Sequence, residues 1–248
     1  MSDFLSKALR HVIRFVPING LRIVLLRMAG VEVGSGVRLA WGSLIGRGAS
    51  IGSGCAVASG CVIGNGVQLR SQVRVARGAS IYEATIGDAV IVGAHARINR
   101  VRVGPRSHVE TDVLCTGFRD GWIEVGHDTY IGIGAVLDWS AGLAIGNYVH
   151  IAGPGTALWT HSSILQALCG EQLDDHKHKL TRSIRIEDHV WIGGHCTIYP
   201  GVTVAHHSVI LPNSAVNAST HPNTLVGGVP ARYVRSISRD GDTWRFEE

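Results

Sequence analysis

Aliphatic side chains recur at every sixth position through the first third of the chain. The series is Val33, Leu39, Ile45, Ile51, Val57, Ile63, Leu69, Val75 and Ile81. Gly follows four of them, and the fourth residue after most of them is small, such as Cys55 and Cys61. An α-helix repeats at 3.6 residues and cannot generate a sustained period of six. We therefore predict a short strand and a turn in every six residues, with one aliphatic side chain of each repeat pointing inward.

The six-residue register continues along the chain, with slips and two interruptions. It slips by one residue at Ile86 and at Val103 and resumes through Val109. Two later runs are Val125, Ile131, Leu137, Ile145, Ile151, and then Ile186, Ile192, Ile198, Val204, Ile210, Val216. The interruptions are Thr116 to Glu124, with Phe118, Arg119 and Trp122, and the longer excursion 160–185. A loop as long as the second is uncommon in so regular a fold unless it is functional.

The two ends of the chain differ from the repeat. Residues 1–29 predict a helical segment, in which Phe4, Leu5, Ala8, Leu9, Val12, Ile13 and Val16 form one apolar stripe and Leu21 to Met28 a second short helix. We favour a cap over the open end of the repeat, which solenoids need. The alternative is a basic helix that makes peripheral contact with an anionic membrane. The repeat domain extends over residues 30–235, and residues 236–248 form a C-terminal tail.

Composition narrows the class of protein. Hydrophobic residues make up 45% of the chain and charged residues 17%, which excludes a disordered polyelectrolyte. The net charge is +4, but the Arg residues are dispersed, so nucleic acid is not an expected partner. Arg14, Pro17, Arg22 and Arg27 interrupt the N-terminal apolar stretch, which predicts a cytoplasmic protein without a spanning helix. Five cysteines without a CxxC pair argue against a disulfide framework and a structural zinc site.

Three C-terminal segments carry a resemblance to a known family: Val190-Trp191-Ile192-Gly193, Tyr199-Pro200-Gly201-Val202-Thr203 and Gly227-Gly228-Val229-Pro230-Ala231-Arg232. With the repeat, they make the chain resemble the sugar O-acetyltransferase branch of the hexapeptide-repeat acyltransferases over about residues 30 to 235. The resemblance implies an all-β solenoid, a left-handed parallel β-helix of hexapeptide repeats with an N-terminal helical cap. It also implies a homotrimer, with each active site between neighbouring subunits.

The resemblance places a catalytic histidine at His161, where the long excursion begins. A sugar hydroxyl attacks an acetyl thioester slowly unless a neutral imidazole removes its proton, and such assistance typically gives about 10² to 10⁴-fold. Histidine suits this role near neutral pH. His176 or His178 of the same excursion is the alternative base. We interpret the turn residues His150, His189, His195, His206 and His207 as structural.

The resemblance implies acetyl-CoA as the co-substrate and no metal. The positions that match the family's CoA contacts are Trp191, Gly194, Pro212, Asn217, Ala218, Arg232 and Arg235. We expect Gly194 to admit the pantetheine arm, and the two arginines to pair with CoA phosphates. The family's usual Thr-Lys pair is Asn217-Ala218 here, and no amide stands near Ile131, where close relatives have an acceptor-binding asparagine. Asp138 is expected to hydrogen-bond a sugar hydroxyl, with a turn aspartate as the alternative.

The leading hypothesis is an acetyl-CoA-dependent O-acetyltransferase that acts on a sugar hydroxyl in surface polysaccharide biosynthesis. One alternative is a sugar N-acyltransferase of the same family, and another is a non-catalytic solenoid scaffold. The family's zinc-dependent carbonic anhydrase needs three converging histidines. His189 and His195 are six residues apart, on different faces of a coil, so they do not converge within one chain.

Overall fold

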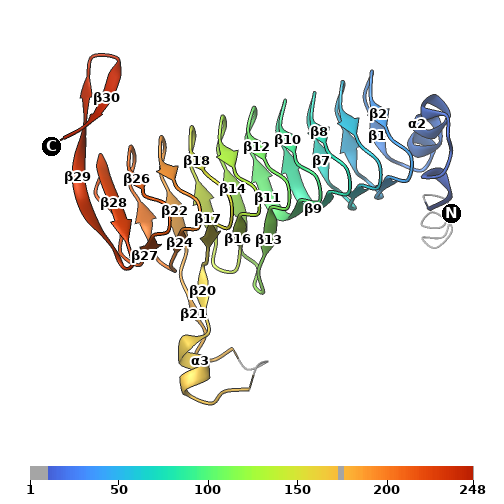
Figure 1. Ribbon diagram of the computed structural model, residues 1–248. Coiled ribbons are helices and arrows are strands. Elements are labelled where there is room, and N and C mark those ends of the chain that lie inside the picture. The colour runs from blue at the N-terminus through green and yellow to red at the C-terminus, as the bar shows by residue number, and fades with distance from the viewer. Residues whose placement is uncertain (1–10, 173–175, 248) are drawn as a thin grey trace. The chain divides into compact units, whose positions relative to one another are not determined.

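The computed structural model describes residues 11–172 and 176–247, and it divides the chain into two compact units, Met1–Leu114 and Cys115–Glu248. Both units are parallel β-solenoids, built from coils of short strands joined by tight turns (Figure 1). This confirms the predicted solenoid. Among the residues described, none of the helices has the length and apolar character needed to cross a membrane.

In the first unit, strands of successive coils pair in parallel on three faces. One face contains β1 (Glu32–Val33), β4 (Ser50–Ile51) and β7 (Gln68–Leu69). A second contains β2 (Arg38–Leu39), β5 (Ala56–Val57), β8 (Arg74–Val75), β10 (Ile91–Val92) and β12 (His108–Val109). A third contains β3 (Leu44–Ile45) and β6 (Val62–Ile63). β13 (Leu114–Thr116) lies at the boundary of the two units.

The predicted inward positions form the core of these coils. Ile51, Ile63 and Leu69 are buried, and so are Cys55 and Cys61 in the small-residue position. The glycine after an aliphatic residue has a steric cause. A Cβ on Gly52 would lie 2.6 Å from the carbonyl carbon of Arg70 in the next coil, closer than real Cβ contacts. Coil stacking therefore requires glycine at this position.

The two register slips correspond to two long strands, β9 (Ser80–Ile86) and β11 (Arg97–Val103). β9 pairs with β6 at one end and with β7 at the other, so it passes from one face to the next without a separate turn. Glu83 and Arg100 occupy its corner and that of β11 in the left-handed backbone region, and their side chains form an ion pair of 3.1 Å. A shortened corner thus produces each slip.

Helix α2 (Asn19–Met28) covers the first coil of this unit (Figure 1). Arg22 and Leu26 are buried, and the Arg22 guanidinium donates to the carbonyl of Ala40 at 2.7 Å. Asn19 donates to the Val37 carbonyl and accepts from the Leu39 amide. A helical cap is therefore present, and its helix α2 begins at Asn19, two residues before the predicted start at Leu21. Most of the predicted first stripe falls in residues 1–10, outside the described residues.

The second unit repeats the three faces. The first holds β14 (Ile123–Val125), β17 (Leu143–Ile145), β22 (Ile184–Ile186) and β25 (Thr203–Val204). The second holds β15 (Tyr130–Ile131), β18 (His150–Ile151), β23 (Trp191–Ile192), β26 (Val209–Ile210) and β28 (Thr224–Gly228). The third holds β16 (Val136–Asp138), β19 (Ala157–Leu158), β24 (Thr197–Ile198) and β27 (Ala215–Val216).

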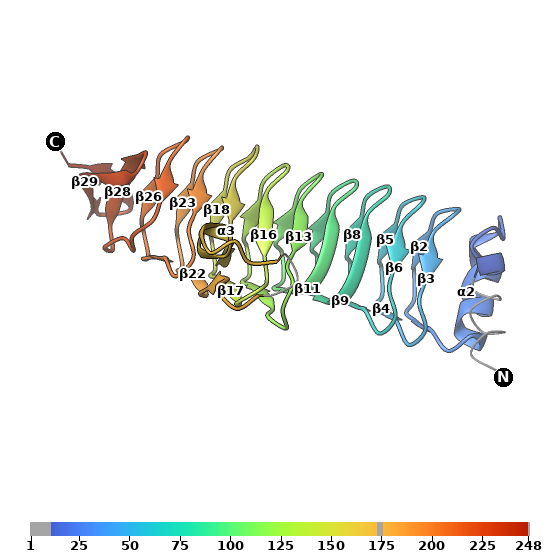
Figure 2. The same ribbon diagram turned by 90° about the horizontal axis from the view of Figure 1, so that it is seen from below.

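The long excursion leaves the coils of this unit as an arm (Figures 1 and 2). β20 (His161–Ser162) and β21 (Leu180–Thr181) pair in antiparallel fashion at its base, with His161 opposite Thr181. The short helix α3 (Ile164–Leu168) lies beyond them. His161 is therefore the residue at which the chain turns from the coil into the arm.

The predicted C-terminal tail is a structured hairpin. β29 (Ala231–Asp240) pairs antiparallel with β28 and with β30 (Thr243–Phe246). The two-residue loop is Gly241 and Asp242, between the paired residues Asp240 and Thr243, and Gly241 has φ +59°, a conformation that glycine adopts without strain. Gly followed by Asp between two strands is a hairpin signal in the sequence.

Candidate active site

His161 and Asp138 form a hydrogen-bonded pair at the base of the arm. His161 follows β19, and Asp138 ends β16 in the preceding coil, where Leu137 pairs with Leu158. The His161 Nδ1 atom lies 2.6 Å from Asp138 Oδ2. The His161 side chain is 21% exposed and that of Asp138 is 0% exposed. The pair thus joins a buried carboxylate to an imidazole that reaches solvent.

The Asp138 carboxylate accepts five hydrogen bonds. The backbone N–H and hydroxyl of Ser140 donate to Oδ1 at 2.9 and 2.5 Å. The backbone N–H and hydroxyl of Thr160 donate to Oδ2, each at 2.8 Å, and His161 is the fifth donor. Burial raises the pKa of Asp138, but the bonds from Ser140, His161 and Thr160 outweigh it and hold that pKa below its usual value. Asp138 is therefore an anion near neutral pH.

An ionised carboxylate only accepts hydrogen bonds, so this contact fixes the imidazole tautomer. His161 Nδ1 carries the hydrogen that is donated to Asp138, which leaves the lone pair of a neutral ring on Nε2. Among the described residues, Nε2 has no hydrogen-bond partner. The ring therefore presents a proton acceptor away from the carboxylate.

Both interruptions of the repeat contribute to the surroundings of His161. Phe118, from the first interruption, meets the His161 ring edge-on at a centroid distance of 4.9 Å. Its backbone N–H donates to the Ser140 hydroxyl at 3.2 Å, the same hydroxyl that binds Asp138. From the arm, Lys179 places Nζ 3.9 Å from the centroid of the Phe118 ring. The interruptions are thus linked through the histidine and its aspartate.

The structure changes the role expected for one predicted residue. Asp138 was expected to hydrogen-bond a sugar hydroxyl, but its side chain is buried and both oxygens accept from protein donors. This arrangement leaves it no direct contact with an acceptor, and its solvent-facing partner is His161. Ser140 and Thr160 were missed by sequence reasoning, although a serine two residues after an aspartate is a common turn pattern.

The two alternative bases lie farther along the arm. The ring of His176 packs on Phe118 at 5.1 Å, on which His161 also packs. His178 Nδ1 lies 3.7 Å from a carboxylate oxygen of Glu171, and its backbone N–H donates to that side chain. Of these three histidines, His161 is the one whose ring forms a hydrogen bond to a fully buried carboxylate, that of Asp138.

The positions matched to CoA contacts lie on the second unit. Trp191 begins β23 on the second face, Gly194 stands in the turn after it, and Arg232 and Arg235 are exposed on β29. Pro212, Asn217 and Ala218 are exposed turn residues. Gly194 has a structural reason of its own, because an added Cβ would lie 2.7 Å from the Gly153 carbonyl oxygen. Close coil stacking therefore suffices to explain this glycine.

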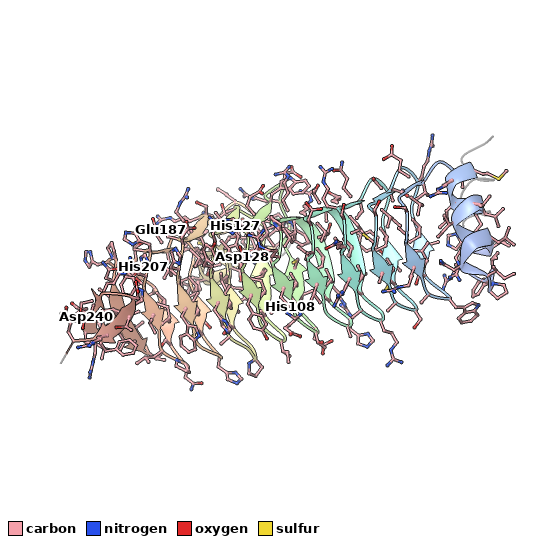
Figure 3. The ribbon with its side chains drawn as sticks, turned by 90° about the horizontal axis from the view of Figure 1, so that it is seen from above. His108, His127, Asp128, Glu187, His207 and Asp240 are labelled. Atoms are coloured by element: carbon pink, nitrogen blue, oxygen red, sulfur yellow. The ribbon has the colours of Figure 1, made fainter. Side chains whose placement is uncertain are left out.

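Two of the turn histidines, His189 and His207, lie in a stacked row of rings at another corner of the coils. Tyr148 stacks on His189 at 5.0 Å, His189 on His207 at 4.7 Å, and His207 on Trp244 of the hairpin at 4.5 Å. A groove of about 710 Å³ along β14, β17 and β22 runs beside this row, and Figure 3 shows His207 and Glu187 from its lining. Among the described residues, no cluster of His, Cys, Asp and Glu is arranged to hold a metal ion.

Comparisons with known proteins agree with the repeat. The family model described as bacterial transferase hexapeptide (six repeats) matches residues 42–77. Galactoside O-acetyltransferase of Escherichia coli is 40% identical over 26% of this chain and 32% of its own length, so the match spans about a third of that relative. WbbJ of the same organism, assigned to lipopolysaccharide biosynthesis as an O-acetyl transferase, is 24% identical over 50% of this chain and 77% of its own.

Solved structures agree on the fold. A point mutant of the N-acyltransferase AntD from Bacillus cereus, in complex with dTDP and coenzyme A, superposes with a TM-score of 0.53 at 16% identity, over 63% of this chain and 85% of its own. An Arabidopsis UDP-N-acetylglucosamine acyltransferase superposes with a TM-score of 0.54 at 14% identity, over 83% and 70%. The repeat indicates that the coils wind as a left-handed β-helix. By its repeat and its fold, the chain is similar to the hexapeptide-repeat acyltransferases, and the curated relatives that it matches include a galactoside O-acetyltransferase and a lipopolysaccharide O-acetyl transferase.

Proposed function

We propose that the protein transfers an acetyl group from acetyl-CoA to a sugar hydroxyl, with His161 as the general base. The names of two relatives, a galactoside O-acetyltransferase and a lipopolysaccharide O-acetyl transferase, support the reaction class. The observation that carries the proposal is the Asp138–His161 pair, in which a buried carboxylate orients one imidazole at the start of the arm. A scaffold has no need of such a pair.

In this reaction His161 accepts the proton of the acceptor hydroxyl at Nε2 while the hydroxyl oxygen bonds to the acyl carbon. Acetyl-CoA, when bound, supplies the acyl group as a thioester. The proton returns from Nε2 to the departing thiol sulfur, which leaves the imidazole neutral. Asp138 acts as a positioning residue: it holds Nδ1 and stabilises the imidazolium while the ring carries the proton. Its five donors keep the carboxylate fixed during the transfer.

The C-terminal hairpin offers groups that fit a CoA phosphate. Arg232 and Arg235 are exposed on β29, and guanidinium groups bind phosphate in bidentate fashion. Trp191 adds a partly exposed indole on β23 of the same unit. We propose that the two arginines bind the CoA phosphates. For Gly194 we propose no CoA contact, because coil stacking alone explains this glycine.

A homotrimer would complete the site. The imidazole of His161 reaches solvent, and the arm leaves the coils beside it (Figure 1). Three copies around a closed ring would place a neighbour opposite each His161, since cyclic symmetry satisfies every subunit. The predicted cytoplasmic location fits a donor made inside the cell, and it stays a prediction.

Acyl transfer to a panel of hexoses and amino sugars tests the proposal. Release of free CoA is followed with a thiol reagent, and the product is then treated with mild alkali. We expect an alkali-labile ester with the wild-type protein. The His195→Ala variant, which removes an exposed turn histidine, should give the same product and is the matched control for His161→Ala. An alkali-stable amide would instead identify the N-acyltransferase alternative. Release of CoA no faster than without protein, for every acceptor, would support the scaffold.

A further inference from the structure

We propose that the outer face of the N-terminal cap docks on an anionic lipid bilayer. Large apolar side chains that are exposed to solvent gather on this part of the first unit. We call them the N-terminal apolar patch: Val12, Phe15, Ile18, Leu21, Val24, Met28 and Trp41. Met28 is 77% exposed and Trp41 58% exposed. This inference concerns where the protein binds and does not rest on acyl transfer.

Helix α2 has two faces with different tasks. Arg22, Leu26 and Ala29 are buried toward the first coil, so the inner face provides the cap. Leu21, Val24 and Met28 follow each other at spacings of three and four residues, which places them together on one helix face. They are exposed, so closing the solenoid does not require them to be apolar. Contiguous apolar surface of this kind usually marks an interaction site.

Aromatic residues extend the patch beyond the helix. The ring of Phe15 meets the ring of Trp41 edge-on at 5.4 Å, which joins the segment before α2 to a turn of the first coils. The guanidinium of Arg14 lies 4.9 Å from the Phe15 ring centroid. Tryptophan and arginine beside apolar side chains suit the boundary between lipid headgroups and acyl chains. With ten residues, α2 is about 15 Å long, so it would lie in that boundary rather than cross it.

The distribution of charge along the chain favours an anionic bilayer as the partner of the N-terminal apolar patch. Residues 11–80 contain eight arginines, of which only Arg22 is buried, and one acidic residue, Glu32, whereas residues 81–248 contain 13 basic and 17 acidic residues. The basic excess of the protein is thus concentrated in the part that carries the patch. Arg27, in the last turn of α2, is fixed by the carbonyls of Val33 and Gly34 beside Met28. A basic, apolar helix surface binds anionic lipid by burial and by charge together.

A second copy of the chain is the competing occupant. In a two-fold contact the patch would meet itself, and its arginines would face arginines. Like charges placed opposite each other oppose association, whereas phosphatidylglycerol headgroups complement them. The charge distribution therefore favours the bilayer over self-association.

Cosedimentation with vesicles tests the inference. We expect the wild-type protein to pellet with phosphatidylcholine vesicles that contain phosphatidylglycerol, and to bind pure phosphatidylcholine more weakly. Binding should weaken as salt rises from about 0.1 M to about 1 M, because the Debye length falls from about 10 to 3 Å. The triple variant Leu21→Gln, Val24→Gln, Met28→Gln should bind the anionic vesicles at least about tenfold more weakly, since apolar burial contributes to the affinity.

The matched control is a triple glutamine variant of Ile164, Leu165 and Leu168, which are exposed on α3. It should bind the vesicles like wild type. If the α2 variant unfolds, quenching of tryptophan fluorescence by brominated lipid provides the test instead. The chain has six tryptophans, and the part of the fluorescence that the lipid quenches should disappear in Trp41→Phe. Absence of vesicle binding by wild type, or equal loss in both triple variants, would overturn the inference. A dimer by light scattering that dissociates only in the α2 variant, without vesicle binding, would assign the patch to a second copy.

Discussion

The Asp138→Asn substitution probes the positioning of His161 with almost no change in side-chain volume. The amide replaces one accepting oxygen by a donating NH₂ group. If that group faces Ser140, the Ser140 backbone N–H loses its acceptor. If it faces His161 and Thr160, the Thr160 backbone N–H loses its acceptor, and His161 Nδ1 must accept, which moves the hydrogen to Nε2. In either orientation one buried backbone donor is unsatisfied.

The magnitudes follow from these contacts. An unsatisfied buried donor costs about 1–3 kcal/mol, and hydrogen bonds to a charged group exceed neutral ones by about 1 kcal/mol, so we expect the free energy of unfolding to fall by about 2–4 kcal/mol. Turnover should fall by about 10² to 10⁴-fold, because the base is either in the wrong tautomer or has lost the charge that stabilises its protonated form. Binding of acetyl-CoA should be nearly unchanged.

Steady-state kinetics, calorimetric titration of acetyl-CoA and thermal unfolding measure the three effects. Asp188→Asn is the matched control, since Asp188 also accepts a backbone hydrogen bond in a coil turn but does not contact His161. It should retain wild-type turnover. A folded Asp138→Asn protein whose turnover stays within about tenfold of wild type would refute the positioning role.

Two further predictions rest on the proposed function, and a third rests on the contacts of Asp138. Arg232→Ala should raise the Michaelis constant for acetyl-CoA and leave that of the acceptor unchanged, as loss of uniform binding requires; an unchanged acetyl-CoA constant would make Arg232 a surface charge. Light scattering should give the mass of a homotrimer, and a monomer at micromolar concentration would contradict the shared site. The folded-state pKa of Asp138 is lowered, so its stabilisation is complete above the unfolded pKa of about 3.9 and is lost as pH falls through the folded value. The difference in unfolding free energy between wild type and Asp138→Asn should therefore narrow below about pH 4, and a constant difference would contradict this.

The coils could be predicted because their signal is local. Each hexad contains its own inward residue, such as Ile51 or Ile63, and its own glycine where the next coil approaches. The cap was predictable for the same reason, since α2 carries its apolar spacing within ten residues. The C-terminal hairpin also has a local signal, the Gly241-Asp242 pair of its loop, although only a tail was predicted there.

The pairing of Asp138 with His161 was harder to predict because it joins two coils. Their separation is 23 residues, whereas paired residues of regular coils are 18 apart. The coil between Leu137 and Leu158 is three residues longer than a regular one, and His161 lies two residues beyond the position opposite Asp138. The strand register, in which Leu137 pairs with Leu158, places Asp138 in the coil next to the start of the arm, and the period of six alone does not reveal this register. The contact of Phe118 with His161 joins two irregular segments, to which the period of six does not apply. The period therefore predicts which side chains point inward, and stacking decides which turn residues meet.

The most direct test of the central claim is acetyl transfer by His161→Ala, measured in single turnover with saturating acetyl-CoA and the best acceptor of the sugar panel. The account predicts a rate lower by about 10² to 10⁴-fold. It also predicts unchanged acetyl-CoA affinity and a small loss of stability, since Asp138 keeps four of its five donors. Transfer within about tenfold of wild type would contradict the account and direct the search to His176 and His178 on the arm.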